Sequence, residues 1–256
     1  MAEQKIGEIK KILESTDVEL LPKVLESFRA DERAGVKTLV AKYDKCYEAL
    51  LKEKERTERM KMYEKKYSDY EFICGIDEAG RGPLAGPVVA GAVILPKDCD
   101  ILYINDSKKL TEKKREELYD IIKEKAVAYG IGIATPERID EINILQATYE
   151  AMRSAIAQMA VAPDLLLNDA VTIPQVSTPQ VPIIKGDAKS ISIAAASILA
   201  KVTRDRMMKE YSIIYPEYGF EGHKGYGSQS HIEAIRTYGP SPIHRRSFIK
   251  NFMGEQ

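Results

Sequence analysis

The chain has 256 residues, of which 44% are hydrophobic and 30% charged, and its formal net charge is −1. This composition predicts a globular protein with a sizeable core, and the near-zero charge argues against a general nucleic-acid coat. No apolar run approaches the roughly 20 residues of a membrane span, and the three scattered cysteines form no metal or disulfide pattern. We expect a reduced, cytoplasmic protein that does not contact a membrane and is a monomer.

Residues 1–67 are expected to be helical throughout. Aliphatic and tyrosine side chains recur there at three- and four-residue spacing, as in Leu39, Val40 and Tyr43. Residues 1–70 hold 16 basic and 15 acidic side chains, which favours a solvated surface. The alternative is a docking appendage for the substrate or for a protein partner of unknown identity. We therefore predict a helical extension over 1–67 and a second domain over 68–256.

From Tyr70 onward, short apolar runs alternate with longer helical patterns. The expected strands are Phe72–Asp77, Val88–Leu95, Val127–Ala134, Leu165–Leu167 and Pro182–Ile184. The expected helices are Glu112 to about Ala126 with Thr111 as its cap, Asn143–Met159, about Ser190–Tyr211 and a short one near Ser230–Tyr238. This order predicts an α/β fold in which helices flank a mixed sheet, followed by a loop-rich C-terminal region. Gly130 and Gly132 are expected to mark close backbone contacts in a strand.

Two adjacent carboxylates, Asp77 and Glu78, end the first apolar strand, and Gly80-Arg81-Gly82 follows at once. Charge at the tip of a buried strand must be solvated, hydrogen-bonded or bound to metal. Glycines let the backbone approach a ligand closely, and arginine suits phosphate. The combination suggests metal-assisted phosphodiester chemistry.

Two further acids, Asp169 and Asp187, follow later apolar runs. Because the ends of neighbouring strands converge, all four carboxylates are able to meet around hard divalent cations such as Mg²⁺ or Mn²⁺. A single Asp at a strand end is more often a turn former or a helix cap, and Asp187 alone would suit a cap for the helix near Ser190. The spacing of these residues does not decide between a metal site and separate turn or cap residues.

Charge is unevenly distributed along the second domain. Residues 71–184 hold 11 basic and 17 acidic side chains, whereas residues 185–256 hold 11 basic and 7 acidic ones. An acidic middle beside a basic end fits a metal–carboxylate centre next to a phosphate-binding surface. Asymmetries of this size also arise by chance.

The second domain resembles the type 2 ribonucleases H, the ribonuclease HII family. The resemblance covers Phe72 to Phe248 in ordered blocks, which are Gly75–Val89, Asn105–Leu110, Lys185–Ser190, Ala195–Asp205, His223–Gly227 and Pro242–Phe248. It implies a ribonuclease H-like mixed sheet flanked by helices, with a C-terminal region that contacts substrate. Some members of the family also carry a helical extension at the amino terminus.

The resemblance implies an activity and a catalytic set. The family hydrolyses the RNA strand of RNA–DNA hybrids and nicks duplex DNA 5′ of embedded ribonucleotides, leaving a 5′-phosphate and a 3′-hydroxyl. Two Mg²⁺ or Mn²⁺ ions would be held by Asp77, Glu78, Asp169 and Asp187. The family often has Asp-Gly where this chain has Asp169-Ala170. Because alanine lacks the freedom of glycine at positive φ, the local turn is expected to differ.

The resemblance also implies how the substrate is read. Gly80, Arg81 and Gly82 would recognise the 2′-hydroxyl, and Tyr226 would pack on the sugar 3′ to the ribonucleotide. The predicted phosphate contacts are Lys108, Lys185, Lys224, Arg245 and Arg246. The alternative for Tyr226 is an ordinary loop tyrosine, and surface lysines are usually only solvated.

Three rival hypotheses remain. The sister type, ribonuclease HIII, uses a similar acidic set, but it usually has a β-containing amino-terminal domain and typically lacks the tyrosine block. A catalytically silent nucleic-acid-binding module on the same fold would not need all four carboxylates. In a purely structural α/β protein the acids would only cap elements.

Overall fold

The computed structural model describes residues 4–252, and the chain divides into two compact units, Met1–Arg59 and Met60–Gln256. The first unit contains α1 (Ile6–Ser15), α2 (Leu21–Glu26) and most of α3 (Ala34–Met60). Its core consists of apolar side chains from all three helices, among them Ile9, Leu25 and Val40. The prediction that the amino-terminal region is helical is confirmed. The predicted boundary at residue 67 lies in the second unit, just after α4 (Met62–Lys66).

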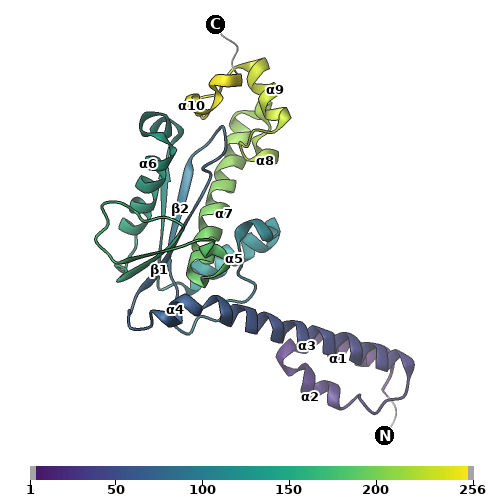
Figure 1. Ribbon diagram of the computed structural model, residues 1–256. Helices are drawn as coiled ribbons and strands as arrows, with labels where there is room; N and C mark the ends of the chain where they lie inside the picture. The colour runs from purple at the N-terminus through teal and green to yellow at the C-terminus, as the bar shows by residue number, and fades with distance from the viewer. Residues whose placement is uncertain (1–3, 253–256) are drawn as a thin grey trace. The chain divides into compact units, whose positions relative to one another are not determined.

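The second unit is built around a mixed five-stranded sheet with strand order β3-β2-β1-β4-β5. The strands are β1 (Ile73–Ala79), β2 (Val88–Ile94), β3 (Ala128–Ala134), β4 (Leu165–Asp169) and β5 (Gln180–Ile183). β1 pairs antiparallel with β2 and parallel with β4, while β2–β3 is antiparallel and β4–β5 is parallel. The predicted mixed sheet is confirmed, and its central strand carries Asp77 and Glu78 (Figure 1).

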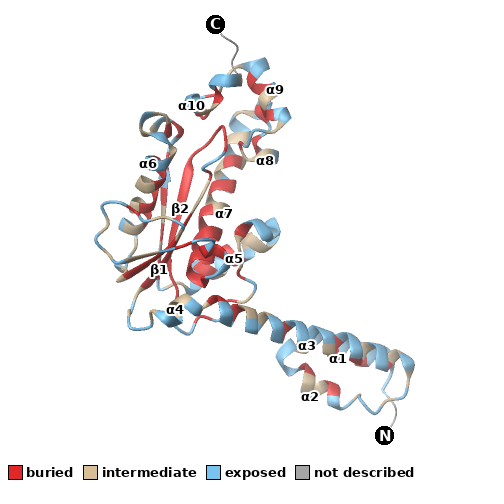
Figure 2. Ribbon diagram, in the orientation of Figure 1, coloured by how far each residue is buried: buried red, intermediate tan, exposed pale blue. Residues whose placement is uncertain are grey.

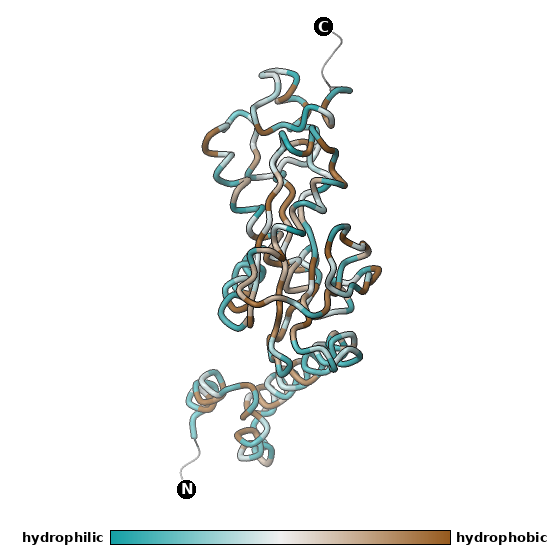
Figure 3. The backbone as a smooth tube through the Cα atoms, turned by 90° about the vertical axis from the view of Figure 1, so that its left-hand side faces the viewer, coloured by the Kyte–Doolittle hydropathy of each residue, from teal (hydrophilic) through white to brown (hydrophobic). Residues whose placement is uncertain are grey.

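Helices cover both faces of this sheet (Figure 1). α5 (Glu112–Lys125) and α7 (Ile191–Ile214) pack on one face, and α6 (Pro136–Ala157) packs on the other. Side chains alternate along β2, so that Val93 joins the α7 side and Ala92 the α6 side. β1, β2 and much of α7 are buried in Figure 2, and hydrophobic residues follow the strands in Figure 3.

Two strand glycines allow α6 to lie directly on the sheet. A Cβ added at Gly130 would lie 2.0 Å from the carbonyl oxygen of Ala155, and one at Gly132 would lie 1.9 Å from that of Ala151. Any side chain at these positions would push the helix away. The expectation of close backbone contacts is therefore confirmed.

The structure corrects the start of α6 and identifies the cap of α7, whose expected start near Ser190 is confirmed. α6 begins at Pro136 rather than Asn143, because Thr135 caps its first turn, and Asn143 instead forms a kink inside it with φ 69°. The Asn143 carboxamide accepts hydrogen bonds from the backbone N–H groups of Leu145 and Gln146, which restarts the helix. α7 is capped by the Ser190 hydroxyl, so Asp187 is not its cap.

The C-terminal region consists of short helices joined by loops: α8 (Phe220–His223), α9 (Gln229–Tyr238) and α10 (Arg246–Ile249). These helices follow the C-terminal end of α7 (Figure 1). Their apolar side chains form small clusters of their own with residues from the loop between β1 and β2. Among residues 4–252, no helix combines the length and the apolar character needed to cross a membrane.

The turn after β4 contains a strained alanine. Ala170 has φ 58°, and its N–H donates to the Ile183 carbonyl over 3.0 Å. Alanine does not prevent positive φ here: Ala170 takes the left-handed conformation that glycine would adopt freely. That the turn differs from that of Asp-Gly family members stays a prediction. For a residue with a side chain the left-handed conformation costs roughly 1–2 kcal/mol.

Replacing Ala170 with glycine should therefore raise the free energy of unfolding by about 1 kcal/mol. Urea denaturation of the full chain measures the change. Ala162→Gly is the matched control: Ala162 is exposed in a loop without positive φ, so added chain entropy should slightly destabilise that variant. Equal losses in the two variants would contradict the strain at Ala170.

Candidate active site

Asp77 and Glu78 occupy the end of the central strand, paired with Gly91 and Ala90 of β2. Asp77 is only 6% exposed, and its Oδ1 accepts a hydrogen bond of 2.7 Å from the Glu78 N–H. Strand alternation directs Glu78 to the other face, where Arg81 Nη1 lies 3.3 Å from its Oε1. Both carboxylates lie within β1 rather than after it, because the strand extends to Ala79.

Asp169 and Asp187 are brought to the same end of the sheet by β4 and by the turn after β5. Asp169 ends β4, which lies beside β1, and its Oδ1 accepts a hydrogen bond of 2.7 Å from the Gly186 N–H. That bond ties Asp169 to the 3₁₀ turn Gly186–Ala188, which contains Asp187. The structure therefore gathers all four predicted carboxylates from three separate segments.

The four carboxylates affect one another electrostatically. Burial raises the pKa values of Asp77, Glu78 and Asp187 above their ordinary values, and the negative charge of Asp169 raises each of them further. Lys108 faces the same group: burial lowers its pKa, but the nearby carboxylates outweigh this and raise it overall. The site thus concentrates more negative charge than its basic side chains neutralise.

This donor set fits a hard divalent cation in its chemistry. Carboxylate oxygens are the ligands that Mg²⁺ and Mn²⁺ prefer, and a cation would relieve the mutual repulsion of Asp77, Asp169 and Asp187. Within residues 4–252, no three histidine, cysteine or acidic side chains are arranged to hold a metal ion as they stand.

Asp106 is a further carboxylate at this site that the sequence analysis did not select. It lies close to Asp187, and its negative charge helps to raise the pKa of Asp187. Its own Oδ1 accepts from the Lys108 N–H over 2.9 Å. The next residue, Ser107, lies 2.9 Å from Ser197, hydroxyl to hydroxyl. The only signal in the sequence was the position of Asp106 beside Lys108 in one of the ordered blocks.

A buried arginine, Arg245, holds the backbone of the Gly80–Gly82 loop. Arg245 is 0% exposed, and its guanidinium donates to the backbone carbonyls of Gly80, Arg81 and Gly86. The prediction that Arg245 contacts phosphate is therefore wrong, because its donors are used inside the protein. Burial lowers its pKa to about 9.

A second buried arginine, Arg204 of α7, was missed by the sequence analysis. It donates to the carbonyls of Ala85, Pro87 and Lys224 over 2.9–3.0 Å. It therefore joins the loop between β1 and β2 to the segment that precedes Tyr226. Nothing in the sequence indicated this role, since the ordered block around Arg204 is typical of a helix that packs through small residues.

Tyr226 lies next to the Gly80–Gly82 loop. A Cβ added at Gly82 would lie 3.9 Å from Tyr226 Cε1, and the Arg204 guanidinium carbon lies 6.0 Å from the ring centroid. Tyr226 is 47% exposed. The structure thus brings the exposed Gly82 and an exposed aromatic ring together.

The other predicted phosphate contacts differ in accessibility. Lys108, Lys185 and Arg246 are exposed, and Lys108 lies near the carboxylates. Lys224 is half-buried, and its Nζ donates to the Glu221 carbonyl. Phosphate contact by these four residues stays a prediction.

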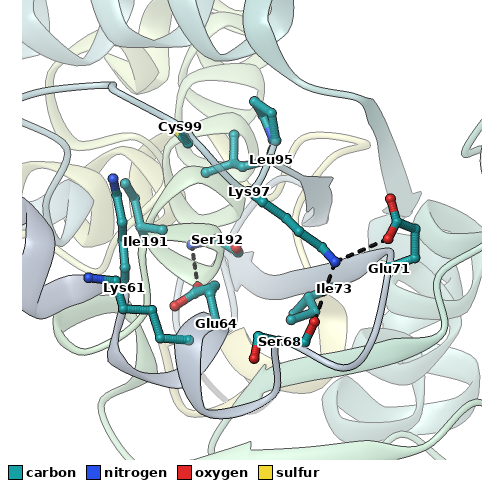
Figure 4. Close-up of a pocket in the computed structure, with 12 residues that line it drawn as sticks. Lys61, Glu64, Ser68, Glu71, Ile73, Leu95, Lys97, Cys99, Ile191 and Ser192 are labelled. Carbon is teal, nitrogen blue, oxygen red and sulfur yellow. Dashed lines mark hydrogen bonds and ion pairs between the residues drawn. The ribbon is translucent and has the colours of Figure 1, made fainter.

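A separate cavity of about 120 Å³ lies between α4, the start of β1 and the start of α7 (Figure 4). Glu64 fastens α4 to α7 there, because its Oε1 accepts from the Ser190 hydroxyl and from the Ser192 N–H. Lys97 bridges to Glu71 over 3.0 Å. No predicted site residue lines this cavity, and we assign it to the anchoring of α4.

The glycine loop generates a test of how closely it is packed. Gly80 has φ 94°, and a Cβ there would lie 2.1 Å from Arg204 Nε, whereas Gly82 has room for one. Gly80→Ala should lower the free energy of unfolding by at least about 2 kcal/mol. The control Gly82→Ala should change it by less than about 0.5 kcal/mol. Equal losses in urea denaturation would show that Arg204 does not constrain Gly80.

Comparison with known proteins agrees with this geometry. The family model for ribonuclease HII matches residues 74–251, and the model for the ribonuclease HII N-terminal domain matches residues 5–68. Ribonuclease HII of Lachnoclostridium phytofermentans is 65% identical over 247 residues, covering 96% of this chain and 97% of its own. Ribonuclease HII of Clostridioides difficile is 55% identical over 255 residues, covering 99% and 100%.

A solved structure shows the same fold. The crystal structure of ribonuclease H2 from Pyrococcus horikoshii superimposes with a TM-score of 0.60 at 30% identity, covering 72% of this chain and 100% of the other. The amino-terminal match is to the ribonuclease HII domain, which separates the chain from the sister type HIII. The chain belongs to the ribonuclease HII family, whose members are hydrolases that cleave the RNA strand of RNA–DNA hybrids.

Proposed function

We propose that this chain nicks duplex DNA on the 5′ side of embedded ribonucleotides, besides cleaving the RNA strand of hybrids. The products would carry a 5′-phosphate on the ribonucleotide side and a 3′-hydroxyl upstream. One observation carries the proposal: four carboxylates meet at one end of the sheet, beside a glycine loop and an exposed tyrosine. Carboxylates serve hydrolysis, and the loop and the ring serve recognition.

The hydrolytic part of the proposal requires divalent metal. Asp77, Glu78, Asp169 and Asp187 would hold Mg²⁺ or Mn²⁺, and we propose two ions when substrate is bound. Such ions supply Lewis acidity, which activates water for attack on phosphorus and stabilises the departing 3′-oxygen. The chain itself keeps two of the carboxylates in place, through the Glu78 N–H on Asp77 and the Gly186 N–H on Asp169.

Recognition rests on the 2′-hydroxyl, the feature that distinguishes a ribonucleotide within DNA. Arg81 and Gly82 are exposed and Gly80 is buried, and Arg245 braces the loop by donating to the carbonyls of Gly80 and Arg81. The loop therefore offers fixed peptide groups at which a sugar hydroxyl would bond. The Tyr226 ring, beside Gly82, would pack on the sugar 3′ to the ribonucleotide and favour an RNA-to-DNA junction.

Asp77→Asn tests the metal role. The change removes a negative charge but no phosphate contact, so cleavage of hybrid and of ribonucleotide-containing duplex should fall about a thousandfold or more. Binding should change little, because phosphate contacts dominate affinity. Cleavage rates and fluorescence anisotropy at one salt concentration measure the two effects.

The control for Asp77→Asn is Asp120→Asn, at an exposed position of α5, which should cleave as the unmodified protein does. Binding lost to the same extent as cleavage would contradict a metal role for Asp77. Cleavage that survives the substitution would contradict the proposed reaction.

Tyr226→Ala tests junction recognition. Stacking on an aromatic ring is worth roughly 1–3 kcal/mol, so kcat/KM on a duplex with one ribonucleotide should fall about 10- to 100-fold. Tyr226→Phe keeps the ring and should retain most of the activity. Thermal stability should stay the same in both variants, since the side chain is half exposed. An unchanged kcat/KM for the alanine variant would exclude the recognition role.

A further inference from the structure

The three histidines of the chain form one cluster next to the Tyr226 segment, in which His231 and His244 are buried and His223 is half-buried. The rings of His223 and His231 stack with centroids 4.4 Å apart, and those of His231 and His244 lie 5.1 Å apart. His231 is 0% exposed and His244 is 2% exposed. Neither ring can reach a substrate, so the cluster is not a source of nucleophiles or of general acids. The role of the cluster must therefore be to hold neighbouring groups in position.

The hydrogen bonds of this cluster run in one direction. The Ser241 N–H donates to His244 Nδ1 over 2.9 Å, so that nitrogen carries no proton. The proton of His244 is therefore on Nε2, which lies 2.9 Å from His231 Nε2 and donates to it. His231 must then carry its proton on Nδ1, which donates to the Tyr226 carbonyl over 2.9 Å. Each group in this series of hydrogen bonds, from Ser241 to Tyr226, therefore has a fixed role as donor or acceptor.

The Tyr226 segment is also held on its other side. The Gly225 N–H donates to His223 Nδ1 over 3.2 Å, and Arg204 donates to the Lys224 carbonyl over 3.0 Å. The Tyr226 side chain, in contrast, is half exposed. The position of the ring is therefore set through its backbone, by the groups that bind residues 224–226.

We propose that His231 and His244 are positioning residues, which orient the Tyr226 ring toward the substrate through a directional relay from Ser241 to the Tyr226 carbonyl. The proposal rests on the proposed role of Tyr226 in reading the junction. It assigns no chemical step to the histidines, because the relay acts by fixing geometry. A misplacement of about 1 Å in a substrate-positioning group can cost on the order of a hundredfold in rate.

The relay requires both rings to be neutral, and their surroundings keep them so. Burial lowers the pKa of His231 to about 4 and that of His244 to about 3. The titratable and charged groups that act on the pair are His223 and Arg246, besides each other, and all of them disfavour protonation. At neutral pH the direction of the relay is therefore fixed.

The first test measures tautomers by ¹⁵N NMR of the histidines in the full, unmodified chain. The relay requires the proton on Nδ1 in His231 and on Nε2 in His244, with both rings neutral between pH 6 and 8. The opposite tautomer at either ring, or a charged ring in that range, would overturn the proposal. This measurement is independent of catalysis and therefore of the proposed function.

The second test uses two variants that differ in the last bond of the relay. His231→Phe and His231→Asn both lose the link to His244, but the asparagine amide can still donate to the Tyr226 carbonyl. On a duplex with one ribonucleotide, His231→Phe should lower kcat by about tenfold or more with little change in KM, and His231→Asn should recover most of that loss. Equal losses in the two variants would overturn the relay.

A double-mutant cycle separates positioning from general structural damage. In a Tyr226→Ala background, His231→Phe should cause no further loss of kcat, because the ring it positions is gone. A full additional loss there would show a structural role and overturn the proposal. If Tyr226→Ala alone leaves cleavage unchanged, the proposed role of Tyr226 fails, and the relay fails with it as a device for recognition, whatever the tautomers are.

Discussion

Two buried guanidinium groups hold together the Gly80–Gly82 loop and the segment that carries Tyr226. Arg245 binds carbonyls of Gly80, Arg81 and Gly86, and Arg204 binds carbonyls of the same loop and of the Tyr226 segment. A buried cation is tolerated only when its donors are satisfied. The Gly80–Gly82 loop and the Tyr226 segment are therefore held in fixed positions relative to each other, since moving either one would leave a buried guanidinium group without its hydrogen-bond acceptors. This constraint gives a glycine loop, flexible by composition, a single backbone conformation.

The carboxylates at the sheet end complement this rigid frame. Two parallel neighbours, β1 and β4, deliver Asp77 and Asp169 side by side, and the Gly186 N–H couples Asp169 to the turn that carries Asp187. The site repels a phosphodiester unless cations offset its charge, which is the electrostatic reason to expect metal dependence. Lys108 alone does not balance the acids around it. The frame thus places the proposed recognition groups next to the acidic end of the sheet.

Much of this could be predicted from the sequence, and the failures have physical causes. Apolar runs ended by Asp77 and Asp169 indicated the sheet and its acidic end, because period and burial are local properties. The environment of Arg245 is not a local property. The sequence shows a guanidinium group, but not whether that group faces solvent or binds backbone carbonyls 159 to 165 residues earlier in the chain. Ala170 adopts a conformation that its residue type disfavours, since the surrounding turn outweighs the strain. The histidine cluster had no spacing signal at all.

The most direct measurement is cleavage of an end-labelled DNA duplex that carries one ribonucleotide, with Mg²⁺, with Mn²⁺ and with chelator, followed by mapping of the product ends. The account predicts a single nick on the 5′ side of the ribonucleotide, with a 3′-hydroxyl upstream, a 5′-phosphate downstream and no product in chelator. Cleavage of a long RNA–DNA hybrid without a nick at the single ribonucleotide would contradict the recognition that we assign to Gly80–Gly82 and Tyr226. Cleavage that persists in chelator would contradict the role of the carboxylates.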